Sequence, residues 1–166
     1  MTNTTYTTIL LACLVAGTFD ITYAIITWGP VFGQVTATQL LQGIASTLAG
    51  KSALTGGTTT ALLGLAMHYG ISLAWTLIYF FIFPHLPFLA WNKWVSGILY
   101  GVFVWAMMTL IIVPLVTGRA YHFSTVPFLK SIAPMVLFFG PAIALIINRH
   151  YFTVSINEQH RHPQVE

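Results

Sequence analysis

The chain has 166 residues and a formal net charge of +3, and 57% of its residues are hydrophobic while only 5% are charged. A soluble domain carries roughly 25% charged residues, so this composition excludes a water-facing globular surface. The few basic side chains are dispersed along the chain and never cluster, which argues against a nucleic-acid partner. We therefore expect the partner to be a lipid bilayer.

Four stretches are long and apolar enough to cross a hydrocarbon core, which needs about 20 mostly apolar residues. They are residues 7–29, 59–83, 94–118 and 128–148, followed by a polar tail, residues 149–166. Runs such as LIYFFIF and LIIVPLV do not alternate polar and apolar residues, which excludes a transmembrane barrel. The predicted fold is an all-α integral membrane protein, a single domain over residues 1–166 with four transmembrane helices.

The first predicted span contains Asp20, the one acidic residue outside the polar tail. Its helical neighbours Ala16, Gly17 and Tyr23 are small or polar, and small residues let another helix come close. The run LLAC at its start resembles a lipoprotein cleavage box, but no basic residue precedes it and the apolar stretch continues. We therefore expect a retained transmembrane helix.

The segment between the first two spans, residues 38–50, predicts a short amphipathic helix. Its apolar positions recur at helical spacing and its polar positions take the other face; the apolar ones are Leu40, Leu41, Ile44, Ala45 and Leu48. Two roles stay open, a connector at the membrane interface and a re-entrant gate, with Gly56-Gly57 as the hinge into the next span. The run ASTLAGKS fits a loose phosphate-loop pattern, but the strand and the magnesium-binding acid that such a loop needs are missing.

The second span carries His68, with Gly64 and Ser72 on the same helical face. His68 and Asp20 lie at equal distances from the connection that joins their spans, each roughly 14 Å below the membrane boundary. In the third span, Thr109 lies at a similar depth. The sequence therefore predicts one polar layer near the middle of the bilayer.

The third and fourth spans carry residues that affect helix packing. Gly97 and Gly101 form a GxxxG step, which packs against a neighbouring helix or against a second copy of the chain. Pro134 and Pro141 each free a backbone carbonyl, so we expect bends in the fourth span.

An ionised carboxyl at mid-membrane costs about 2.5 to 3.5 kcal/mol on insertion scales, so Asp20 needs a partner. His68, Tyr23 and Thr109 are candidate hydrogen-bond donors, and in a low dielectric the carboxyl can also stay protonated. An Asp–His pair that shares one proton suits proton movement, cation binding or a polar ligand. The alternative is that these residues only hold helices together.

The segments LVAGTFDITYA, LLQGIASTLAG, GGTTTALLGLAMHYGISLAW and GILYGVFVWAMM, with IIVPL after them, carry a family resemblance. In combination they resemble the YagU-like small bacterial inner-membrane proteins, a family of unknown function. The resemblance implies that Asp20 and His68 are recurrent polar residues. The chain departs from the family where Thr109 replaces an expected asparagine, and where Pro134 and Met135 stand in place of an expected histidine.

Two functions from different classes follow from these observations. The first is proton- or cation-linked transport or small polar ligand binding at Asp20 and His68, with Tyr23, Thr109 and Ser72 nearby. The second is a non-catalytic membrane subunit or scaffold. An enzyme is not expected, because one Asp, one His and scattered hydroxyls form no zinc site, and we expect no cofactor.

The predicted location is a bacterial inner membrane. Basic residues divide equally between the two sides, so only the histidines favour cytoplasmic N- and C-termini. Four short helices enclose little space, which predicts a homo-oligomer or a larger membrane complex.

Overall fold

The computed structural model describes residues 3–29, 35–86, 89, 91–118 and 122–161, with side chains as far as Phe152. Within these residues the chain is helical, with no strand. Four helical segments are long and apolar enough to cross a membrane: Asn3–Trp28, Gly57–His85, Lys93–Thr117 and Thr125–Phe152. The predicted all-helical chain with four candidate spans is therefore confirmed. The histidines of the tail, from His160 on, lie outside the described side chains.

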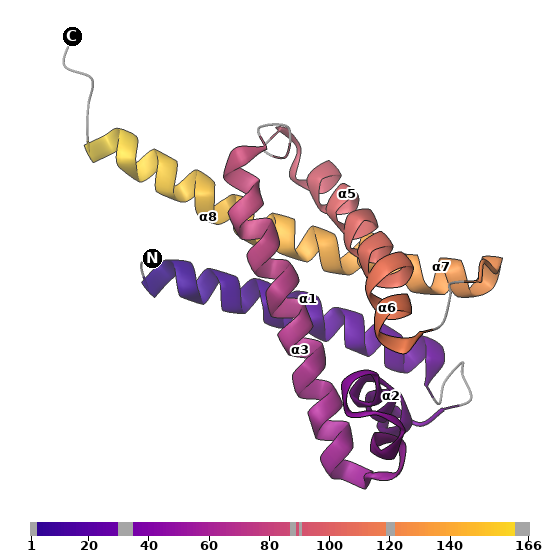
Figure 1. The fold of residues 1–166 in the computed structure, drawn as a ribbon. Coiled ribbons are helices and arrows are strands. Elements are labelled where there is room, and N and C mark those ends of the chain that lie inside the picture. The colour runs from indigo at the N-terminus through magenta and orange to yellow at the C-terminus, as the bar shows by residue number, and fades with distance from the viewer. Residues whose placement is uncertain (1–2, 30–34, 87–88, 90, 119–121, 162–166) are drawn as a thin grey trace.

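The first two spans are α1 (Asn3–Trp28) and α3 (Gly57–Ile82), the latter extended by a 3-10 turn, η2 (Phe83–His85). Helix α1 packs against α3 on one side and against the fourth span on the other. The chain termini and the end of α3 lie at one end of the molecule, whereas α2 lies at the other (Figure 1). We call these the terminal end and the α2 end.

The third span comprises α5 (Lys93–Ala106), η3 (Met107–Ile112) and α6 (Val113–Thr117). The fourth comprises α7 (Thr125–Pro134), η4 (Met135–Phe139) and α8 (Gly140–Arg161). Both η3 and η4 are π-helical turns, and each is followed closely by a proline, Pro114 or Pro141. Proline lacks an N–H and its ring clashes with the carbonyl four residues earlier, and a widened turn relieves that clash. In the fourth span, where bends were expected at Pro134 and Pro141, the structure has the π-turn η4 between these two prolines.

Glycines bring the third and fourth spans together without intervening side chains. A Cβ on Gly97 would lie 2.6 Å from the Pro141 Cα, and a Cβ on Gly101 would lie 2.1 Å from the Met135 carbonyl oxygen. Gly140 faces them, because its Cβ would lie 2.1 Å from the Gly97 carbonyl oxygen. The GxxxG step therefore packs within the molecule, against the fourth span.

The segment between the first two spans forms α2 (Ala37–Ala49), which begins with a capping box between Thr36 and Gln39. It packs along the first half of α3, where a Cβ on Gly64 would lie 1.9 Å from the Leu41 carbonyl oxygen. Gln42, on the polar face of α2, is buried against α3, where its Nε2 donates a hydrogen bond to the Gly57 carbonyl oxygen (3.0 Å). Leu48, on the apolar face, is 74% exposed, and the predicted insertion of that face in the membrane stays a prediction.

The hydrophobic core lies toward the terminal end. It joins the start of α1 and the end of α3 with α5 and α8; its fully or almost fully buried members include Ala12, Tyr79, Val104, Ile143 and Ile147. None of the residues of η3 or α6 is buried, whereas Ala45 of α2 and Ala61 of α3 are buried at the α2 end.

Candidate functional site

Helices α1 and α3 cross at Gly17, near the middle of both spans. A Cβ on Gly17 would lie 3.0 Å from the Ser72 Oγ and 3.1 Å from the Tyr69 ring. The absence of a side chain on Gly17 therefore allows the close approach, and Ser72 is buried beside it.

His68 is held at this crossing by the backbone of α1. Its Nε2 lies 2.9 Å from the Gly17 carbonyl oxygen. A carbonyl can only accept, so Nε2 carries the proton, and Nδ1 of the neutral ring remains able to accept another one. Next to it the Thr18 Oγ1 and the Tyr69 hydroxyl form a 2.8 Å hydrogen bond. Two polar contacts thus tie α1 to α3 at this depth.

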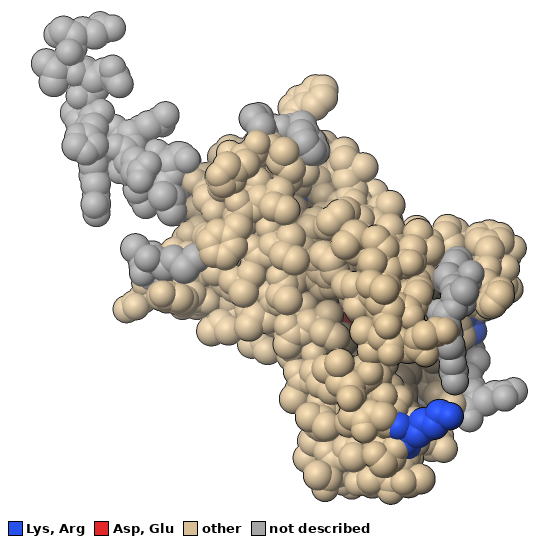
Figure 2. Space-filling view, viewed as in Figure 1, with Lys and Arg blue, Asp and Glu red and all other residues tan. Residues whose placement is uncertain are grey.

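Asp20 lies one helical turn beyond Gly17 on the same face of α1. His68 meets α1 at that same turn, because its Nε2 lies 2.9 Å from the carbonyl oxygen of Gly17, three residues before Asp20. Both side chains are half-buried, and within the described residues Asp20 forms no hydrogen bond or ion pair. The surface around it is almost entirely uncharged, with a trace of acidic colour inside a hollow (Figure 2).

The predicted polar layer also included Tyr23 and Thr109. Tyr23 packs its ring against Phe138 of the fourth span, with centroids 6.3 Å apart. Thr109 lies in the π-turn η3, half-buried. Among the described residues neither of them forms a hydrogen bond with Asp20, and His68 forms none with it either; His68 and Ser72 instead meet α1 at Gly17.

A second polar cluster, which the sequence analysis missed, joins three helices near the terminal end. The Tyr79 hydroxyl of α3 bonds the Ser96 hydroxyl of α5, and it donates to Asn148 Oδ1 of α8 at 3.0 Å. Asn148 Nδ2 in turn points to the Leu89 carbonyl oxygen at 3.5 Å. These side chains are at most 2% exposed. We call Tyr79, Ser96 and Asn148 the buried triad.

The sequence did contain an indication of the buried triad. Tyr79 continues the helical face of His68, Ser72 and Trp75, and Asn148 is an uncharged polar residue at the end of an apolar run. In the sequence, Asn148 marks only the boundary of the fourth span, and Ser96 does not stand out among many small residues. Their meeting depends on how α3, α5 and α8 pack, which no local pattern contains.

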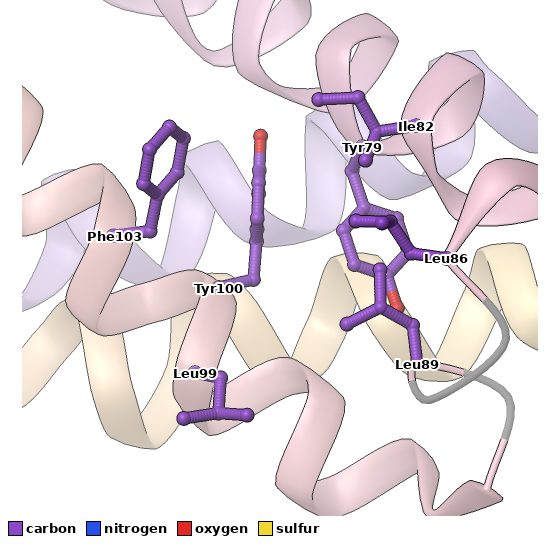
Figure 3. Close-up of a pocket in the computed structure, with 7 residues that line it drawn as sticks. All are labelled: Tyr79, Ile82, Leu86, Leu89, Leu99, Tyr100 and Phe103. Carbon is purple, nitrogen blue, oxygen red and sulfur yellow. The ribbon is translucent and has the colours of Figure 1, made fainter.

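An apolar pocket of about 250 Å³ lies beside the buried triad; it is lined by Tyr79, Ile82, Leu86, Leu89, Leu99, Tyr100 and Phe103 (Figure 3). The rings of Tyr100 and Phe103 lie side by side, with centroids 6.0 Å apart. The Tyr100 hydroxyl donates to the Trp75 carbonyl oxygen, and so does not serve the pocket. The lining can exclude water but offers little to orient a polar ligand.

Within the part of the chain that the structure describes, no three His, Cys, Asp or Glu side chains gather as a metal site would require. Asp20 and His68 supply two such groups, which suits a proton or a weakly held cation better than a structural zinc ion. Comparisons of this chain with protein-family models, with curated proteins and with solved structures find no match.

Proposed function

We propose that this chain is a multi-pass membrane protein in which Asp20 and His68 bind a proton or small cation as part of transport across the bilayer. The observation that carries the proposal is the position of Asp20 in α1: half-buried at mid-span, without a hydrogen-bond partner in the described structure, and one helical turn from Gly17, whose carbonyl oxygen holds His68. Intramembrane acids of this kind mark ion and proton pathways.

The charge balance of the pair explains why a proton or a cation would bind. With one shared proton the pair is neutral overall, either as acid and imidazole or as carboxylate and imidazolium. Loss of that proton leaves one negative charge in a medium of low dielectric, which is costly unless a cation replaces it. The exchanging proton can be held by His68 Nδ1 or by the Asp20 carboxyl.

A structural role is the second candidate, and the bonds at the helix crossing favour it. The contacts of His68 with Gly17 and of Thr18 with Tyr69 tie α1 to α3. Interhelical hydrogen bonds of this kind are worth about 0.6 to 2 kcal/mol. In this case the chain would be a membrane subunit or scaffold.

The bacterial inner membrane, the cytoplasmic termini, the homo-oligomer and the YagU-like family remain predictions from the sequence. The structure is consistent with both ends of the chain lying on one side of the membrane, because Thr8 Oγ1 of α1 lies 3.3 Å from His150 Nδ1 of α8. Labelling of a cysteine introduced at Lys51, from each side of the membrane, would decide the orientation.

The test is proton flux into liposomes that contain the purified chain, followed with an internal pH-sensitive dye. Asp20→Asn removes the acid with little change of shape. His68→Gln keeps an N–H that can reach the Gly17 carbonyl oxygen but cannot carry a proton. We expect each variant to lower the flux at least about tenfold, as the loss of a proton-transferring group does.

Thr18→Val is the matched control, because it breaks the neighbouring interhelical bond and leaves Asp20 and His68 in place. We expect it to retain flux. If the wild type carries neither proton nor cation flux, or if Thr18→Val and His68→Gln behave alike, the transport proposal is wrong and the structural role is favoured.

A further inference from the structure

A recess opens at the terminal end, between the start of α5 and the outer part of α8. It has a volume of about 410 Å³ and is lined by Lys93, Leu145, Asn148, Arg149 and Phe152. A neighbouring recess of about 350 Å³ shares Lys93 and Phe152 and adds Trp91, Asn92 and Trp94. We call the two together the basic recess.

The charged groups of the basic recess are all positive. Lys93 and Arg149 are both exposed there, one from each helix. Among the residues whose side chains the structure describes, which end at Phe152, Asp20 in α1 is the only acidic one. A guanidinium and an ammonium that line one recess suit the oxygens of a phosphate group, which the guanidinium can bind through two parallel bonds.

The position of the basic recess indicates which phosphate it would meet. Lys93 begins the third candidate span and Phe152 ends the fourth, so the recess lies at the boundary of the apolar layer. Headgroup phosphates lie at this level, and basic residues there attract anionic lipids.

Exposed aromatic side chains point to the same occupant. Trp91 is 92% exposed, and Trp94 and Phe152 are 55% and 56% exposed. Tryptophan is typical of membrane interfaces, where its ring meets the headgroup level. A lipid offers both a phosphate for the basic side chains and an apolar body for these rings, whereas a small soluble anion offers only the first.

We propose that the basic recess binds the phosphate headgroup of an anionic membrane lipid, with Lys93 and Arg149 on the phosphate and Trp91, Trp94 and Phe152 against the lipid body. This site is separate from Asp20 and His68, and it does not depend on the function proposed for them.

The test is native mass spectrometry of the full chain in mixed micelles that hold equal amounts of phosphatidylglycerol and phosphatidylcholine. We expect the wild type to retain phosphatidylglycerol over phosphatidylcholine by about tenfold. The double variant Lys93→Gln and Arg149→Gln should lose this preference. A charge-conserving double variant, Lys93→Arg with Arg149→Lys, should retain the preference for phosphatidylglycerol. That result would show that the chain folds when these two positions change.

Lys51→Gln with Lys130→Gln is the matched control, because it removes the same charge at the α2 end. Lys130 lies there over the Trp28 ring, at 5.0 Å. We expect this control double variant to leave the lipid preference unchanged, and we expect the same of Asp20→Asn. The proposal is overturned if the wild type shows no preference, if both neutralised double variants lose it equally, or if inorganic phosphate displaces the lipid, which would indicate a soluble anion.

Discussion

Two polar groups of residues lie within the spans, and their surroundings differ. The buried triad is almost fully inaccessible, and its hydroxyls and its amide oxygen are hydrogen-bonded to one another. Asp20 is half-buried and, among the described residues, has no hydrogen bond. A satisfied and sealed network fixes the packing of helices, whereas an accessible acid can exchange a proton.

Tyr79→Phe tests the structural role of the buried triad. The change removes one hydroxyl and leaves Ser96 and Asn148 Oδ1 buried without that partner. We expect the free energy of unfolding to fall by about 1 to 3 kcal/mol, the cost of unsatisfied buried polar groups. Thermal unfolding in detergent, followed by circular dichroism, measures it.

Tyr6→Phe is the control for this change, since Tyr6 is 55% exposed on α1. We expect no measurable shift from it. Equal unfolding temperatures for Tyr79→Phe and the wild type would show that the buried triad does not stabilise the fold.

At the scale of elements, glycine and proline decide how the third and fourth spans meet. Gly97, Gly101 and Gly140 let the two backbones touch, and Pro114 and Pro141 each follow a π-turn.

Gly101→Ala should therefore destabilise the packing of α5 on the fourth span. The added methyl would lie 2.1 Å from the Met135 carbonyl oxygen, and backbone atoms cannot yield as a flexible side chain does. We expect a loss of about 1 to 3 kcal/mol, as for other overpacked sites. The unfolding temperature in detergent reports it.

Gly70→Ala in α3 serves as the comparison, because nothing lies within 4 Å of a Cβ at that position. Alanine is the better helix former, so this variant should be neutral or more stable. A Gly101→Ala chain as stable as Gly70→Ala would contradict the close packing.

Much of this architecture could be predicted from the sequence, for identifiable reasons. Apolar length gives the four candidate spans, and equal distances from a shared connection place Asp20 and His68 at one depth. The rotation of each helix about its own axis cannot be obtained in this way. For that reason the sequence names His68, Tyr23 and Thr109 alike as candidate donors to Asp20, and among the described residues none of the three is hydrogen-bonded to it.

Over the whole molecule, the hydrophobic core lies at the terminal end, and α2 packs on the first half of α3 at the other end. The core joins α1, α3, α5 and α8, while η3 and α6 contribute no buried residue. Neither Asp20 nor His68 belongs to this core.

The most direct test of a proton-exchanging pair is the pH dependence of the Asp20 carboxyl, measured by difference infrared spectroscopy in lipid. The wild type is compared with Asp20→Asn, which assigns the band, and with His68→Gln. We predict a carboxyl band that changes with pH and whose pH dependence shifts when His68 is replaced. A band that stays that of a protonated acid throughout, with or without His68, would contradict the proposal and leave Asp20 a structural residue.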